Sequence, residues 1–133
     1  MGHGIAVRLL LKPVVHFYRD LVVWKKSMAL VLGVYRCTRC FPKTETDGLT
    51  SQLRRAAVAI PSNIAEGQVR LSAVEFERYV GNARGSLMEV ETRVLIAQDL
   101  GYIEHGESDS LLAMTAEVGQ VLNGLLATLP DRR

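Results

Sequence analysis

Apolar residues in this chain recur at alternating spacings of three and four positions, the pattern of one face of an α-helix. The clearest run begins at an S-x-x-E capping box formed by Ser72 and Glu75 and ends before Gly101, where a terminating glycine is expected. Its inner face comprises Phe76, Val80, Ala83, Leu87, Val90, Val94 and Ala97. The pattern predicts a helix of about 28 residues, roughly 42 Å long at about 1.5 Å per residue.

An earlier helix is predicted over residues 18–40. Its expected inner face repeats at spacings of four and three: Phe17, Leu21, Trp24, Met28, Val31 and Tyr35. Phe41 precedes Pro42, and the residue before a proline is pushed out of the α conformation, so the helix should end there. Residues 1–16 lack such periodicity, and we expect them to form a poorly ordered N-terminal extension.

The next helix is predicted to begin at an N-cap supplied by Thr44, Thr46 or Asp47, whose side chains can accept a hydrogen bond from a free backbone N–H. Its expected inner face comprises Leu49, Leu53, Ala56, Ile60, Ile64 and Gly67. Pro61 lies inside this pattern and removes one backbone hydrogen bond, so we expect a kink just before it.

A fourth helix is predicted to begin near Glu107 or Ser108 and to end before Pro130. Its expected inner face comprises Leu111, Met114, Val118, Val121 and Leu125. Short connections between long helices favour antiparallel neighbours. The sequence therefore predicts an all-α fold, an antiparallel up-and-down four-helix bundle over residues 17–129, followed by a C-terminal tail at 130–133.

The helices carry more apolar surface than one bundle core requires. The residues outside the four predicted inner faces include Tyr79, Met88, Leu95, Ile96, Leu112, Leu122 and Leu126. Exposing them would create larger apolar patches than soluble monomers usually carry, and the small residues Gly81, Ala83, Gly85 and Ser86 would allow a neighbouring helix to approach. An irregular bundle that buries them all is the alternative. We expect a stable homo-oligomer.

The net charge of +2 conceals an uneven distribution. Residues 1–70 carry 11 Lys and Arg against 4 Asp and Glu, whereas residues 71–129 carry 3 against 9. The two halves could complement one another within or between subunits, or the basic half could leave a face for a polyanion. No apolar run approaches the roughly 18 residues of a membrane span, and residues 5–15 lack a clear signal-peptide cleavage site. We expect a cytoplasmic protein without membrane association.

Several longer motifs resemble a single bacterial family. They are FYRDL at 17–21, WKK at 24–26, FPK at 41–43, LTSQLRRA at 49–56, IPSNIAEG at 60–67 and ARGSLME at 83–89. In this order they resemble the four-helix bundle family encoded by intervening sequences in 23S ribosomal RNA genes. The accessory protein of diversity-generating retroelements is similar to it. The resemblance extends over about residues 17–129.

The resemblance implies a ring-like homo-oligomer, with a pentamer favoured. It also implies nucleic-acid association through a basic surface, since the retroelement relative works with a reverse transcriptase and RNA. The family often has a basic, Gly-containing stretch after its Glu-Gly pair, and here only Arg70 in residues 68–70 can serve that role. We therefore expect an RNA- or rRNA-linked accessory or scaffold protein. The alternative is a purely protein-interacting scaffold without affinity for RNA or DNA.

Six basic residues are candidate nucleic-acid contacts because Arg and Lys form charge-assisted contacts with phosphate. They are Arg54, Arg55, Arg70, Arg84, Lys25 and Lys26. The competing interpretation is structural: Arg54 or Arg55, and Arg84, pair with Glu66, Glu89 or Glu91 and fix helix register or a subunit interface. A separate polar cluster, Ser62, Asn63 and Glu66, follows Pro61 and is expected to satisfy the backbone carbonyls that the proline frees.

No catalytic or metal site is predicted. Cys37 and Cys40 form a C-x-x-C pair, but no second pair completes a zinc site, and they lie late in a helix, where its dipole does not lower a thiol pKa. Glu-x-x-His pairs, glycine-rich phosphate loops and a nucleophile beside a histidine base are missing from the sequence. We expect no enzymatic activity, no metal, no cofactor and no small-molecule substrate.

Overall fold

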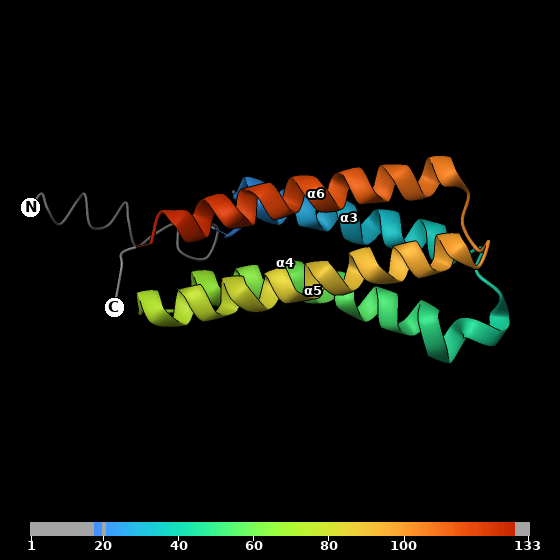
Figure 1. Cartoon of the computed structure of the whole chain (residues 1–133). Coiled ribbons are helices and arrows are strands. Elements are labelled where there is room, and N and C mark those ends of the chain that lie inside the picture. Colours follow the sequence, from blue (N-terminus) through green and yellow to red (C-terminus); the bar gives the residue numbers. More distant parts are fainter. Residues whose placement is uncertain (1–17, 20, 130–133) are drawn as a thin grey trace, which may run out of the picture.

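The computed structural model of the chain describes residues 18–19 and 21–129, and every regular element in this part is helical. Four of these elements are long helices, which confirms the all-α, four-helix prediction. Figure 1 shows these helices lying side by side. They are α3 (Val22–Thr38), α4 (Ser51–Gln68), α5 (Ala73–Asp99) and α6 (His105–Ala127). The expected extension at 1–16 and tail at 130–133 lie outside the described residues.

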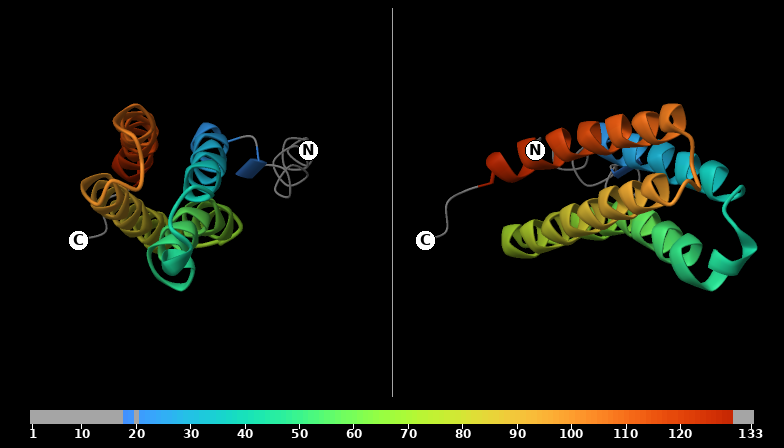
Figure 2. Two further views of the ribbon diagram at one scale, coloured as in Figure 1. Left: turned by 90° about the vertical axis from the view of Figure 1, so that its right-hand side faces the viewer. Right: turned by 45° about the vertical axis from the view of Figure 1, so that its right-hand side comes forward.

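Each long helix packs mainly against two others. Helices α3 and α5 both contact α4 and α6, and the left view of Figure 2 shows the four helices at the corners of a bundle. The short helical turns η1 (Lys43–Glu45) and η2 (Thr46–Thr50) connect α3 to α4. Tyr102, between α5 and α6, donates its hydroxyl to Glu45 Oε2 at 3.0 Å. This hydrogen bond joins the two connections at one end of the bundle.

The predicted inner faces of α4 and α5 are confirmed. All the predicted inner residues of the α4 region are buried, and those of α5 are buried except Phe76, which is half-buried. The backbone N–H of Glu75 donates to Ser72 Oγ at 3.1 Å, as the capping box predicts. Gly101 has φ = 77°, so it adopts the left-handed conformation expected just past a helix end.

The predicted inner face of α3 is wrong by one position at three of its residues, whereas Val31 is buried as predicted. Trp24 and Met28 are only half-buried, and Tyr35 is 40% exposed. The buried residues are Val23, Ser27, Leu30, Val31, Val34 and Thr38. Ser27 Oγ donates to Trp24 O at 2.8 Å and Thr38 Oγ1 donates to Val34 O at 2.8 Å. Because each hydroxyl is satisfied by its own helix, these polar residues can occupy the core.

Helix α6 begins at His105 rather than at Glu107 or Ser108. Part of its predicted inner face is wrong for the same reason as in α3. Its buried residues are Ser108, Leu111, Thr115, Val118 and Leu122. Thr115 Oγ1 donates to Leu111 O at 2.7 Å and Ser108 Oγ donates to Gln98 Oε1 at 2.8 Å. The predicted Met114, Val121 and Leu125 are half-buried instead.

Helix α6 is long and apolar enough to cross a membrane by length and composition, contrary to the expectation that no segment approaches such a span. A core helix of a soluble protein meets the same criteria, so this single helix is weak evidence of a membrane span. In the bundle, α6 contributes the fully buried Val118 and Leu122 to the core.

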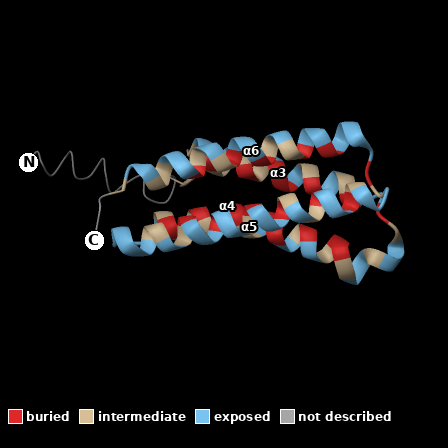
Figure 3. Ribbon diagram, viewed as in Figure 1, coloured by how far each residue is buried: buried red, intermediate tan, exposed pale blue. Residues whose placement is uncertain are grey.

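Of the apolar residues predicted to lie outside the inner faces, the exposed ones all lie on α5. Met88, Leu95 and Ile96 are exposed, whereas Leu122 of α6 is buried. The remaining residues of the predicted set, Tyr79, Leu112 and Leu126, are half-buried. Figure 3 shows the exposed outer faces of the four helices around a buried interior.

Candidate nucleic-acid interface

A basic surface of the bundle lies where the end of α3 meets the start of α4. These two ends are adjacent because α3 and α4 form an antiparallel hairpin closed by η1 and η2 (Figure 1). Five side chains define what we call the arginine surface: Tyr35, Arg36, Arg39, Arg54 and Arg55. Arg36, Arg39 and Arg55 are exposed, and Arg54 is half-buried between the two helices.

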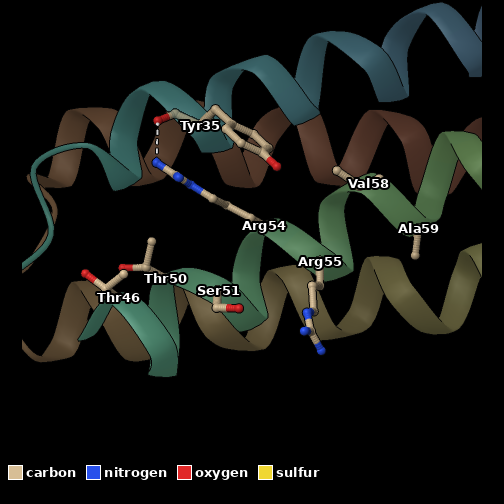
Figure 4. Close-up of a pocket in the computed structure, with 8 residues that line it drawn as sticks. All are labelled: Tyr35, Thr46, Thr50, Ser51, Arg54, Arg55, Val58 and Ala59. Carbon is tan, nitrogen blue, oxygen red and sulfur yellow. Dashed lines mark hydrogen bonds between the residues drawn. The ribbon is translucent and has the colours of Figure 1, made fainter. Parts of the chain in front are cut away.

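Arg54 is held in place by α3. Its Nε donates to Thr38 Oγ1 at 2.7 Å, and its guanidinium carbon lies 4.5 Å from the centre of the Tyr35 ring. Figure 4 shows the further hydrogen bond from Nη2 to the Tyr35 carbonyl, at 3.5 Å. Arg54 thus connects α4 to α3 while part of its guanidinium still faces solvent.

Two hollows open on either side of the Arg54–Tyr35 pair. One has a volume of about 520 Å³ and is lined by Tyr35, Thr46, Thr50, Ser51, Arg54, Arg55, Val58 and Ala59. The other has a volume of about 480 Å³ and is lined by Leu32, Tyr35, Arg36, Arg39 and Arg54. Figure 4 shows the hydroxyls of Thr46, Thr50 and Ser51 near the start of α4, beside the arginines. The first hollow therefore combines hydroxyl groups with cations.

The described residues provide no carboxylate partner for the arginine surface. Among residues 18–19 and 21–129, none of its four arginines forms an ion pair with a carboxylate. The nearby Glu45 is already engaged, because it accepts hydrogen bonds from the Leu49 N–H at 3.1 Å and from the Tyr102 hydroxyl. A surface of this kind attracts anions, and phosphate oxygens are suitable acceptors for its guanidinium groups.

The other predicted contacts lie elsewhere. Arg70, at the α4–α5 turn, pairs with Glu66, donates to the Tyr79 hydroxyl at 3.0 Å, and lies 4.0 Å from Glu75. Arg84, on α5, donates to Asn123 Oδ1 of α6 at 3.2 Å. These contacts favour the structural interpretation for Arg70 and Arg84.

Lys25 and Lys26 lie in the first turns of α3, at the opposite end of that helix from Arg36 and Arg39. Lys26 Nζ forms an ion pair with Glu117 of α6 at 3.0 Å, whereas Lys25 is exposed. The six predicted residues are therefore not brought together as a group, and only Arg54 and Arg55 belong to the arginine surface.

The three residues of the predicted polar cluster after Pro61 make different contacts. Asn63 Nδ2 donates to the Ala59 carbonyl at 2.8 Å. This is a backbone contact, but the carbonyl that loses its N–H donor to Pro61 is that of Ala57, four residues before the proline. Ser62 is exposed, and Glu66 pairs with Arg70 instead of serving the backbone. Pro61 itself is buried within α4.

The two cysteines are free thiols; Cys37 is half-buried and Cys40 is exposed. Burial raises the pKa of the Cys37 thiol, and the charges of Glu107 and Cys40 raise it further. A raised pKa lowers the thiolate fraction and hence the reactivity of Cys37. Within the described part of the chain, no three His, Cys, Asp or Glu side chains gather where they could hold a metal ion.

Sequence reasoning missed Arg36 and Arg39. Arg36 lies in the last turn of α3 and Arg39 is its C-cap residue; a spacing of three residues places both on the same side of the helix. In an antiparallel hairpin they come close to Arg54 at the start of α4. The spacing of Arg36 and Arg39 was visible in the sequence. To connect them with Arg54, however, one had to know that α3 and α4 pair and which face of α3 points outward.

The described residues thus form a four-helix bundle with a basic surface at one end. Residues 19–124 match the model of the 23S rRNA-intervening sequence protein family, and the chain belongs to this family. This confirms the resemblance in the sequence motifs.

A crystal structure from Bacteroides thetaiotaomicron, described as a protein of unknown function from the S23 ribosomal protein family, is similar. The TM-score is 0.74 at 21% sequence identity, and the match covers 80% of this chain and 100% of that chain. At this identity the likeness shows the fold alone. No curated protein matches the chain significantly.

Proposed function

We propose that this protein is a non-enzymatic, cytoplasmic bundle that self-assembles and associates with nucleic acid, as an RNA- or rRNA-linked accessory or scaffold protein. The observation that carries the proposal is the arginine surface, whose four arginines have no carboxylate partner in the described part of the chain. The proposed assembly is a ring-like homo-oligomer, with a pentamer favoured by the family resemblance.

The chemistry of the arginine surface supports phosphate binding. Arg54 is held by Thr38 and Tyr35, so little side-chain entropy is lost when it meets a ligand. Arg36 and Arg39 line one hollow with Arg54, and Arg55 lines the other; all three are exposed cations. The logarithm of the affinity for a single strand falls linearly with the logarithm of the salt concentration. Each phosphate that an arginine neutralises contributes about −0.7 to this slope.

The test is binding of a fluorescent fragment of 23S rRNA, measured by anisotropy across a salt series. The double variant Arg39→Ala, Arg55→Ala should bind more weakly than the wild type and show a salt slope that is shallower by about 1.4. The control variant Arg78→Ala, Arg93→Ala removes the same charge from α5 and should bind nearly as well as the wild type.

Two results would contradict the proposal. If the wild type does not bind RNA at low salt, the protein has no electrostatic affinity for it, and the purely protein-interacting scaffold becomes the better hypothesis. If both double variants lose affinity equally, net charge alone drives binding and the arginine surface is not the interface.

A further inference from the structure

Two cysteines lie at the end of α3, in the segment that also builds the arginine surface. Cys37 belongs to the last turn of α3 and is half-buried, whereas Cys40 follows the helix and is exposed. The two residues between them are Thr38 and Arg39. Thr38 accepts the hydrogen bond that holds Arg54, at 2.7 Å, and Arg39 lines the hollow of about 480 Å³. A change in the backbone between the two cysteines therefore reaches the arginine surface.

The backbone brings the two cysteine side chains to the same side of the turn. The Cys40 N–H donates to the Cys37 carbonyl at 3.3 Å, so the hydrogen bond joins residues three apart. In such a turn the side chains at the two ends eclipse one another, and the two Cα atoms lie less than about 7 Å apart. Disulfides join Cα atoms about 4.4–6.8 Å apart. This turn is therefore compatible with a disulfide between the two sulfurs.

We propose that Cys37 and Cys40 form a reversible disulfide that releases Arg54 from Thr38 and weakens the binding of RNA to the arginine surface. This inference rests on the RNA-binding part of the proposed function and adds a regulation to that site. The oxidant is a small-molecule disulfide such as glutathione disulfide, which exchanges with accessible thiols. In cytosolic proteins, disulfides are usually transient and redox-sensing, as a reversible bond of this kind would be.

The reaction consists of two thiol–disulfide exchange steps. The exposed Cys40, as thiolate, attacks glutathione disulfide first, displaces one glutathione and keeps the other on its Sγ. Cys37 then attacks Cys40 Sγ as thiolate and displaces the second glutathione. The protein gives up two protons and two electrons, and glutathione disulfide is reduced to two molecules of glutathione. Burial raises the pKa of the Cys37 thiol, and the charges of Glu107 and Cys40 raise it further, which suits Cys37 to the second step rather than the first.

Closing the disulfide tightens the turn. Cβ atoms three residues apart on a helix are about 5–6 Å apart, whereas those of a disulfide are about 3.5–4.5 Å apart. The backbone at Thr38 and Arg39 has to take up this difference of roughly 1–2 Å. Thr38 Oγ1 accepts from Arg54 Nε at 2.7 Å and donates to the Val34 carbonyl at 2.8 Å, and hydrogen bonds this short do not tolerate such a shift. Figure 4 shows Arg54 reaching from α4 to α3, where the shift would release it.

The expected effect on RNA binding comes from geometry rather than from charge. A protonated thiol and a disulfide are both uncharged, so oxidation leaves the number of cations on the arginine surface unchanged. Arg54 loses its preorganised position, and Arg39 moves with the turn. We expect the affinity for RNA to fall about 3- to 10-fold, the scale of one weakened charge-assisted contact, with the salt slope unchanged. The variant Arg39→Ala, Arg55→Ala differs in this respect, because it makes the slope shallower.

The test compares the reduced and the oxidised full-length protein. Treatment with glutathione disulfide should lower the intact mass by that of two hydrogen atoms, and the protein should remain a single chain on a non-reducing gel. The anisotropy assay with the 23S rRNA fragment should then show the weaker affinity, and dithiothreitol should restore it. The control variant Cys40→Ser, changed at an exposed position, cannot close the disulfide and should keep its affinity for RNA under the same treatment.

A second measurement does not depend on RNA. In the reduced protein, Arg54→Ala removes the contact with Thr38 and lowers the free energy of unfolding in urea. In the oxidised protein this contact is already lost, so the same substitution should lower the free energy of unfolding clearly less. If the reduced wild type does not bind RNA at low salt, the proposed function fails. The intact mass and the urea measurement would still decide whether the disulfide forms and releases Arg54.

Three results would overturn the inference. The first is a mixed disulfide that stays on Cys40, or chains linked to one another through Cys40, in place of the internal bond. The second is a closed disulfide with an unchanged affinity for RNA in a wild type that binds RNA when reduced. The third is an equal effect of Arg54→Ala on the stability of the two forms, which would show that oxidation leaves the contact with Thr38 intact.

Discussion

Replacing Arg54 with alanine tests whether this residue holds the α3–α4 hairpin as well as contributing charge. The substitution removes a charge-assisted hydrogen bond to Thr38 and a cation–π contact with Tyr35. Such hydrogen bonds contribute about 1.5–3 kcal/mol and exposed cation–π contacts about 0.5–1 kcal/mol. Because the guanidinium is only half-buried, solvent screening reduces these values, and we expect a loss of about 1–2 kcal/mol.

The loss is measured as the decrease in the free energy of unfolding, obtained from urea denaturation. The slope of this free energy against urea concentration should stay unchanged because the fold is the same. Arg54→Lys keeps the charge but lacks the planar fork that reaches Thr38 while stacking on Tyr35. This variant should therefore lose most of the same stability. It separates the structural role of Arg54 from its charge, which is what RNA binding requires.

A double-mutant cycle with Thr38→Val identifies the contact responsible. Thr38 accepts a hydrogen bond from Arg54 and donates one to the Val34 carbonyl, and only the first involves α4. We expect a coupling energy of about 0.5–1.5 kcal/mol between the two substitutions. If Arg54→Ala stays within about 0.3 kcal/mol of the wild type, or if the two effects simply add, then Arg54 is a surface charge with no part in holding the hairpin.

Two further predictions test the burial pattern. Leu122→Ala, in the core of α6, should lower the free energy of unfolding by about 2–5 kcal/mol. Leu125→Ala, at a half-buried position, should lower it clearly less in the same urea experiment, and equal losses would contradict the observed burial of α6. Burial raises the pKa of Cys37, so near pH 8 iodoacetamide should alkylate the exposed Cys40 faster than Cys37. Peptide mass spectrometry measures the two rates, and a result in which Cys37 reacts first would refute this prediction.

The sequence predicted α4 and α5 correctly because their inner faces are almost entirely apolar. The core positions of α3 and α6 include hydroxyl residues, so counting apolar residues alone selected a neighbouring row. In α3 the row containing Trp24 and Tyr35 has the same spacing as the buried row containing Val23 and Val34. Periodicity cannot separate two such rows, whereas hydroxyls that bond to their own helix can occupy the inner one.

Helix α3 turns a different row of residues toward the core than the sequence predicted, and this limited how much of the candidate site could be predicted. With Tyr35 assigned to the core, its contact with Arg54 could not be predicted, although Arg54 and Arg55 were recognised as candidates. The structure turns Tyr35 outward, where its ring meets the Arg54 guanidinium. Arg70 and Arg84 looked equivalent in sequence, but Arg70 pairs locally with Glu66 and also contacts Tyr79. Arg84 contacts Asn123, which is 39 residues away, so this contact depends on the packing of α5 against α6.

The uneven charge of the chain can now be related to its surfaces. Among the described residues, the ion pairs Lys26–Glu117 and Arg70–Glu75 join the basic half to the acidic half. They lie away from the arginine surface, which keeps its charge because α3 and α4 both belong to the basic half. Among the described residues, the arginine surface is therefore a basic region without a carboxylate partner.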